Sequence, residues 1–238
     1  MRTSERRQLK QDKFAETTKE TISWAVEHRA ALVTTLVVVG VAMAAIIGGL
    51  WYWKHNNTAA NAALGKAMQI YEAPVLPGGA PDMPGVLTFT SAQERARAAH
   101  NEFQKIADQY GRTAPGKLAR YMAAMTSIQT GDAKSGEQQL QQVVSSGNKE
   151  IAGLAKLSLA GIYRDSNRAK DAIPLYKDLI ANSVATVPKV TAQLELAAVY
   201  EATGQPGEAS KLYQEIIKES PQSPAAMTAN QKLGSLTK

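Results

Sequence analysis

Small and large apolar residues recur along this chain at a nearly constant spacing. A small residue is followed four positions later by a large apolar one, and the pair occurs four times: Ala99 and Phe103, Gly136 and Leu140, Ala172 and Tyr176, Ala209 and Tyr213. Successive pairs are 37, 36 and 37 residues apart. A period of about 20 to 50 residues is typical of stacked-repeat proteins. The spacing therefore predicts a solenoid, not a single closed core.

Within each repeat, the pattern predicts two antiparallel helices joined by a short turn. In the last repeat, Ala209, Tyr213 and Ile216 fall at i, i+4 and i+7, on one face of a helix. Gly204 and Pro206, just before this helix, are typical of a helix end and a helix start. We expect helical hairpins over about residues 58–110, 114–146, 150–182 and 187–219, and a capping helix over 225–236.

These repeats resemble the tetratricopeptide repeat, a helix-turn-helix unit. The residues that carry the resemblance are Leu196–Tyr200, Gly204, Ala209, Tyr213 and Pro221, and Leu159–Tyr163, Ala172 and Tyr176 repeat most of them. Two features depart from the pattern. Ser127 replaces the tyrosine in one unit, and Arg120, Lys156 and Gln193 stand where the family often has tryptophan. The resemblance implies an all-α fold in which the repeats form an α-solenoid.

The first hairpin contains an insertion. We expect its two helices over residues 59–73 and 92–110. The segment between them, residues 74–90, holds four prolines and three glycines, so it cannot form a helix. It should form an exposed loop, and a loop of this length is either functional or disordered.

A long apolar segment precedes the repeats. Residues 30–53 are 24 residues without a charge, and about 20 suffice to cross the hydrocarbon core of a membrane. Trp51, Tyr52 and Trp53 at its end are aromatic residues that favour the headgroup layer. Two alternatives are a buried helix of a soluble protein and a signal peptide cleaved near Ala44. The length of the run and the 29 residues before it favour an uncleaved signal-anchor.

The charges beside this segment predict its orientation. Seven basic residues precede it, whereas Lys54 and Lys66 are the only two among the thirty residues that follow. Cytoplasmic flanks carry the excess of lysine and arginine. We therefore expect residues 1–29 in the cytoplasm and residues 54–238 outside it, in the periplasm if the organism is a bacterium with two membranes.

Two further features concern the membrane. Phe14, Thr18, Ile22, Ala25 and Val26 form a narrow apolar stripe in the tail, which either lies on the inner leaflet or is part of a solvated stem. Gly40, Ala44 and Gly48 stand four apart, so one side of the spanning helix lacks large side chains. Such a groove lets a partner helix approach closely, including one from a second copy, although the pattern also arises by chance.

Composition and charge exclude several functions. Residues 54–238 hold 20 basic and 16 acidic groups with the signs interspersed, so we expect no nucleic acid partner. The chain has no cysteine, hence no disulfide and no cysteine-based metal site. Its three histidines are scattered, and no catalytic, metal-binding or phosphate-binding motif is present. We expect a protein that is not an enzyme and needs no cofactor.

Solenoids of hairpins usually bind proteins or peptides on their concave surface. In the tetratricopeptide repeat family, the first helix of each unit lines that surface. We select seven of the matching positions in this chain as a candidate groove: Tyr121, Met125, Ile128, Leu157, Arg164, Leu194 and Glu201. Leu157 and Leu194 are also ordinary packing candidates. The set is mixed and not strongly basic, which favours apolar or unfolded segments over a C-terminal carboxylate as ligands.

The whole layout resembles the bacterial ancillary SecYEG translocon subunit family, also called the YfgM-like family. That resemblance implies a single-span inner-membrane protein near the secretion channel, with translocon subunits, a membrane-bound peptidyl-prolyl isomerase and exported proteins as partners. Our leading hypothesis is a tethered module that binds exported chains. The alternative is a scaffold subunit of an envelope complex that binds one folded partner.

Overall fold

The computed structural model describes residues 26, 28–76 and 84–236. The chain divides into two compact units, Met1–His55 and Asn56–Lys238, and the long helix α2, Arg29–Glu72, contributes residues to both. Most of the predicted tail stripe and the centre of the insertion lie outside the described residues.

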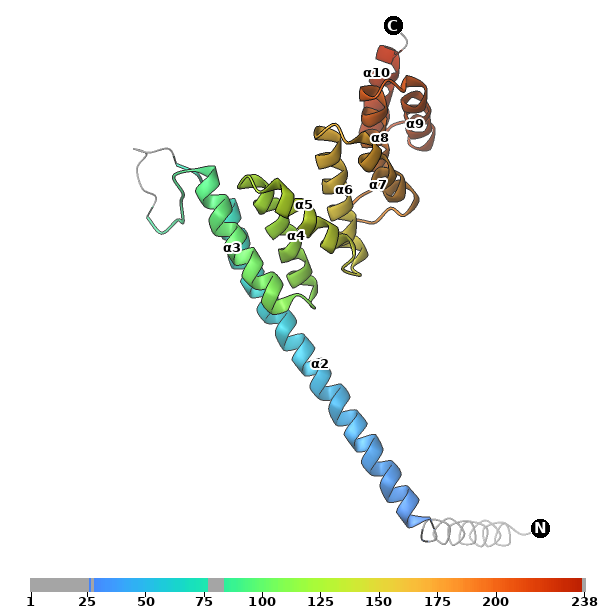
Figure 1. The fold of residues 1–238 in the computed structure, drawn as a ribbon. Coiled ribbons are helices and arrows are strands. Elements are labelled where there is room, and N and C mark those ends of the chain that lie inside the picture. The colour runs from blue at the N-terminus through green and yellow to red at the C-terminus, as the bar shows by residue number, and fades with distance from the viewer. Residues whose placement is uncertain (1–25, 27, 77–83, 237–238) are drawn as a thin grey trace, which may run out of the picture. The chain divides into compact units, whose positions relative to one another are not determined.

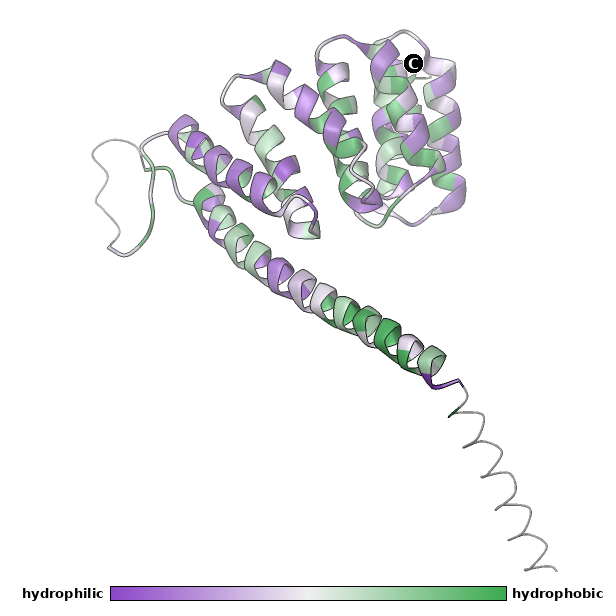
Figure 2. Ribbon diagram, turned by 60° about the horizontal axis from the view of Figure 1, so that its bottom comes forward, coloured by the Kyte–Doolittle hydropathy of each residue, from purple (hydrophilic) through white to green (hydrophobic). Residues whose placement is uncertain are grey.

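The first unit contains the apolar part of α2. This helix is long and apolar enough to cross a membrane, and none of its most apolar stretch is buried by the rest of the chain. Figure 2 shows the hydrophobic colour concentrated in the N-terminal part of α2. We predicted an apolar helix over 30–53 and a helix over 59–73, and a single helix, α2, runs through both and through Asn56, Asn57 and Thr58 without a break. The reason is that this short polar stretch contains no glycine or proline to end the helix.

The second unit is a stack of helices, and the prediction of an all-α solenoid is confirmed (Figure 1). After α2, the helices in chain order are α3 Ala92–Tyr110, α4 Ala114–Gln129, α5 Ala133–Val144, α6 Lys149–Asp165, α7 Ala169–Ala181, α8 Lys189–Ala202, α9 Pro206–Glu219 and α10 Pro224–Leu236. Each packs on the next in the chain, from α3 to α10. The stack is therefore built from sequence neighbours, as in other repeat proteins.

Local sequence fixes where these helices begin and end. Side chains of Ser91, Thr113 and Asn148 accept hydrogen bonds from main-chain N–H groups at the starts of α3, α4 and α6. Gly204, in the turn before α9, has a φ of 70°, which glycine adopts without strain. Pro206 is the first residue of α9. The turn chemistry thus sets the length of each repeat.

The recurring small and large residues form the core of the stack. Phe103, Leu140, Tyr176 and Tyr213 are all buried. The small partner allows two helices to approach closely: a Cβ on Gly136 would lie 2.8 Å from the main-chain oxygen of Ala124 in α4. The repeated pattern therefore encodes helix packing, and the missing side chain at Gly136 is required by it.

The ends of the insertion are held together. The Leu76 N–H donates to the Phe89 carbonyl at 2.9 Å, and the Phe89 N–H donates to the Pro74 carbonyl at 3.0 Å. The described residues of the segment, 74–76 and 84–90, are not helical, as expected. These two hydrogen bonds hold the start of α3 close to the end of α2.

His100, one of the three scattered histidines, lies on α3. Its side chain is half-buried and its Nδ1 lies 2.9 Å from the main-chain oxygen of Ala123. Its position is therefore structural, because it joins α3 to α4.

Candidate protein-binding surface

The first helices of successive hairpins form one continuous row. α4 contacts α6, α8 contacts α10, and an ion pair between Arg164 and Glu195 joins α6 to α8. Helices that approach their counterparts in the next repeat lie on the inner side of a curved solenoid. We call α4, α6, α8 and α10 the inner helices. All seven residues of the candidate groove lie on α4, α6 or α8, and all seven are half-buried.

The groove residues of α4 have different roles. Tyr121 reaches the next inner helix, where its hydroxyl lies 3.0 Å from Ser158 Oγ. Ile128 instead fills the space beside Gly136, since a Cβ there would lie 2.4 Å from Ile128 Cγ1. Met125 packs on the edge of the core and makes no polar contact in the described part of the chain. Ile128 is therefore mainly a packing residue, whereas Met125 remains available to a ligand.

Arg164 joins α6 to α8. Its guanidinium pairs with Glu195 on α8 and with the neighbouring Asp165, 2.9 Å away. The hydrogen bond to Asp165 and the attraction of Glu195 keep the pKa of Arg164 above its ordinary value. Beneath this pair, burial raises the pKa of Tyr176 to about 12, and the Glu195 carboxylate adds to the rise. Arg164 is thus a charged link between repeats before any ligand binds.

Glu201 has the same role one repeat later. Its carboxylate accepts a hydrogen bond from the Tyr213 hydroxyl at 2.7 Å and pairs with Lys232 of α10 at 3.1 Å. Burial, together with this hydrogen bond, raises the pKa of Tyr213. Sequence reasoning placed Glu201 on the inner surface but missed that the last helix neutralises it.

The apolar groove residues lie between these polar links. Leu157 and Leu194 pack on the core and keep part of their surface exposed. Gly161 lies on the same inner helix as Leu157, and a Cβ built there would meet no atom within 4 Å. The inner surface therefore offers half-exposed apolar side chains with open space at Gly161, framed by ion pairs that are already satisfied. This combination suits an apolar segment better than a charged one.

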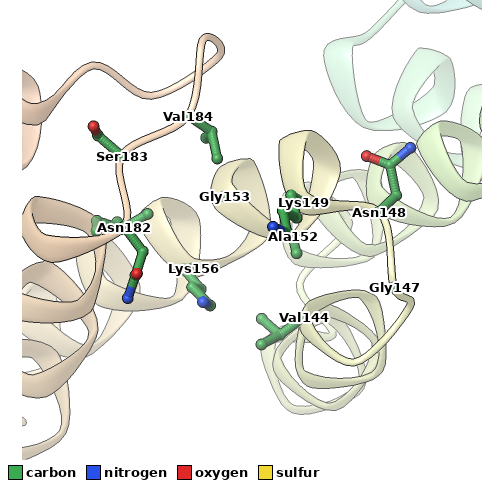
Figure 3. Close-up of a pocket in the computed structure, with 11 residues that line it drawn as sticks. Val144, Gly147, Asn148, Lys149, Ala152, Gly153, Lys156, Asn182, Ser183 and Val184 are labelled. Carbon is green, nitrogen blue, oxygen red and sulfur yellow. The ribbon is translucent and has the colours of Figure 1, made fainter.

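The structure also has a cleft that sequence analysis missed. It has a volume of about 520 Å³ and lies between the end of α5, the start of α6 and the loop from α7 to α8 (Figure 3). Its lining residues are Val144, Gly147, Asn148, Lys149, Ala152, Gly153, Lys156, Leu179, Asn182, Ser183 and Val184. No repeat position marks this cleft, because a loop between repeats forms one of its walls.

That loop is fastened to α6. Thr186 donates from its N–H to the Glu150 carboxylate at 2.9 Å and from its hydroxyl to the Glu150 main-chain oxygen at 2.8 Å. The hydrogen bonds from Thr186 lower the pKa of Glu150. Gly153 makes room for the loop, since a Cβ there would lie 2.5 Å from Val184 Cγ2. The cleft is therefore a fixed feature of the second unit.

The two lysines of the cleft differ. Lys156 forms an ion pair with Asp178 of α7 and thereby lowers the pKa of that carboxyl. Lys149 is exposed and, within the part of the chain that the structure describes, forms no ion pair. Among the described residues, Lys156 is therefore neutralised by an ion pair, whereas Lys149 faces solvent without one.

The small residues of the apolar helix remain open to a partner. Gly40, Ala44 and Gly48 are exposed, and a Cβ on either glycine would meet nothing within 4 Å. Helix pairing at this position therefore remains a prediction.

Among the described residues, no group of three or more histidine, cysteine, aspartate or glutamate side chains could hold a metal ion. The ion pairs described above join helices and have the geometry of structural contacts.

Comparison with known proteins gives one family and one fold. The family described as Tetratricopeptide repeat-like domain matches residues 23–238. No curated protein matches the chain significantly. Two crystal structures of a putative kinesin light chain with nearly identical TPR-like repeats from Podosopora anserina are similar, each at 14% identity with a TM-score of 0.55. They cover 76% of this chain and 85% and 86% of their own, so they show a shared fold alone.

Proposed function

Since the chain belongs to the tetratricopeptide repeat-like domain family, we propose that it is a membrane-tethered module that binds other proteins. One observation carries this proposal. The same chain contains an exposed apolar helix long enough to span a membrane and a solenoid of the kind that binds proteins. Tethering raises the effective concentration of the binding surface at the membrane.

We further propose that the apolar helix is a signal-anchor of a bacterial inner membrane, with the N-terminus in the cytoplasm and the repeats in the periplasm. The excess of basic residues before the helix supports this orientation. The proposed ligands are segments of exported proteins that are still unfolded as they leave the Sec channel. Half-exposed Met125, Leu157 and Leu194 support an apolar ligand. Translocon subunits and a membrane-bound peptidyl-prolyl isomerase are the proposed neighbours.

The test is photo-crosslinking in living cells with the full-length protein. In one variant, a crosslinking residue replaces Gly161, where the inner surface has open space. In the control it replaces Gly207, which has equally open space but lies on α9, an outer helix that is not among the inner helices. Crosslinks from position 161 to translocon subunits and many exported proteins would support the proposal. One dominant envelope protein at stoichiometric yield would instead indicate the scaffold function.

A second variant separates binding from folding. Met125→Glu with Leu157→Glu places two charges among the half-exposed apolar residues of the inner helices. We expect these changes to weaken the capture of exported proteins while the circular dichroism spectrum stays helical. Capture that is unchanged, in a protein that remains folded and in the membrane, would contradict a role for the inner surface.

A further inference from the structure

Three cationic residues lie in or beside the turn between α3 and α4. Arg112 is exposed in the turn and Lys117 is half-buried in the first part of α4. The Arg120 guanidinium lies against Gly111 and donates to the Ala107 carbonyl at 3.4 Å. We call Arg112, Lys117 and Arg120 the turn cations.

No carboxylate neutralises this cluster. Within the described ranges, 28–76 and 84–236, none of the turn cations forms an ion pair. The first turn of α4 contains no acidic residue, so the positive end of that helix adds to the same field. The nearest acidic side chain in the sequence, Asp108, accepts a hydrogen bond from Gln104 at 3.0 Å. The turn therefore presents a net positive surface.

The turn lies at the end of the second unit where the chain enters it. Arg95, near the start of α3, donates to the Ala73 carbonyl just beyond α2 at 3.1 Å, so α2 and α3 run antiparallel (Figure 1). Fifteen residues along α3 lead to Tyr110, and fifteen residues back from Ala73 lead to Thr58, each about 22 Å at 1.5 Å per residue. The α3–α4 turn is therefore level with the first residues of this unit.

Chain connectivity limits how far the start of the second unit lies from the aromatic cluster at 51–53. Thr58, which is level with the turn, follows that cluster by five residues, or about 7.5 Å of helix. This length is within the roughly 8 to 10 Å over which charges act at physiological salt.

We propose that the turn cations bind anionic phospholipid headgroups and so hold the α3–α4 turn against the bilayer surface. This inference rests on the proposed membrane tether and adds an orientation to it. Each lysine or arginine near an anionic surface favours the bound state by about fivefold. Arg112 and Lys117 together should therefore shift the equilibrium between the free and the lipid-bound turn by about 25-fold towards the bound state.

The absence of cysteine makes a site-specific test simple. A single cysteine at Ala114, the exposed first residue of α4, carries a fluorophore, and the control carries it at Ala133, the exposed first residue of α5. The full-length protein is reconstituted in vesicles of phosphatidylethanolamine and phosphatidylglycerol, or of phosphatidylcholine alone, that contain a lipid with a headgroup quencher. We expect strong quenching at 114 in the anionic vesicles, weak quenching in the neutral ones, and little at 133 in either.

Charge variants test the cause. Arg112→Gln with Lys117→Gln should abolish the extra quenching at 114, whereas Lys134→Gln in the first turn of α5 should leave it unchanged. Arg120 is kept because it packs against Gly111. Should the double variant unfold, salt offers a second test, since raising the salt concentration must remove the extra quenching of the unchanged protein.

The outcomes separate the tether from the lipid contact. Extraction of the protein from vesicles by alkaline carbonate would overturn the tether and with it this inference. A protein that resists extraction but shows equal quenching at 114 in anionic and neutral vesicles would overturn the lipid contact alone.

Discussion

Replacement of Gln193 should stabilise the repeat domain. Gln193 on α8 is fully buried, and among the described residues neither its amide nitrogen nor its amide oxygen has a hydrogen-bond partner of acceptable geometry. The amide does lie close to the Glu215 carboxyl, whose pKa is lowered chiefly by Lys189. Proximity alone does not satisfy the amide, because a hydrogen bond requires a suitable distance and angle between donor and acceptor.

The expected size follows from the cost of a buried, unpaired polar group. Such a group costs about 1 to 3 kcal/mol, and an apolar residue of similar shape avoids that cost. Leucine branches at Cγ where glutamine has a straight chain, so part of the gain is lost to imperfect packing. Gln193→Leu should therefore raise the free energy of unfolding by about 1 to 2 kcal/mol. For a domain of this size the melting temperature should rise by about 2 to 8 °C.

The assay is thermal and urea unfolding of the full-length protein in detergent, followed by circular dichroism. Gln142→Leu is the matched control, because Gln142 is exposed on α5 and the same change there should alter stability by less than about 0.5 kcal/mol. A loss of more than about 1 kcal/mol in Gln193→Leu would refute the reasoning, since it would mean that the amide is paired in solution.

Other predictions concern helix packing and pH. Gly136→Ala should lower the free energy of unfolding by about 1 to 3 kcal/mol, because its Cβ would meet the main chain of α4, whereas Gly161→Ala should raise it by up to about 1 kcal/mol. Urea unfolding of both variants checks this; equal effects would contradict it. The Lys156 hydrogen bond holds the pKa of Asp178 below its ordinary value of 3.8. The stabilisation that this carboxylate contributes is therefore present at pH values above the ordinary pKa and is lost as the pH falls below it. Asp178→Asn should be less stable than the unchanged protein at neutral pH. In thermal melts between neutral pH and a pH below the ordinary pKa of Asp178, its melting temperature should decrease less as the pH falls.

Much of the fold could be predicted from the sequence because each hairpin is a local structure. The 36- or 37-residue period gave the buried positions Phe103, Leu140, Tyr176 and Tyr213. The continuity of α2 between the apolar segment 30–53 and the helix expected over 59–73 was not predicted. Residue type alone does not end a helix when no glycine or proline is present.

The binding surface was less predictable. Sequence register placed Arg164 and Glu201 on the inner helices, but it did not indicate that Glu195 and Lys232 neutralise them. Such contacts join different repeats, and their geometry depends on how the repeats stack. The cleft beside α6 was missed for the same reason, since its wall depends on Gly153 facing a loop some thirty residues later.

The most direct test of the central claim is to block the inner surface without disturbing the fold. Gly161→Trp fills the open space on α6, and Gly207→Trp makes the same change on the outer helix α9. The account predicts that capture of exported proteins in cells falls by about tenfold, equivalent to about 1.4 kcal/mol, in the first variant and is unchanged in the second. Equal capture by both variants, at equal stability and membrane content, would contradict protein binding through the inner helices.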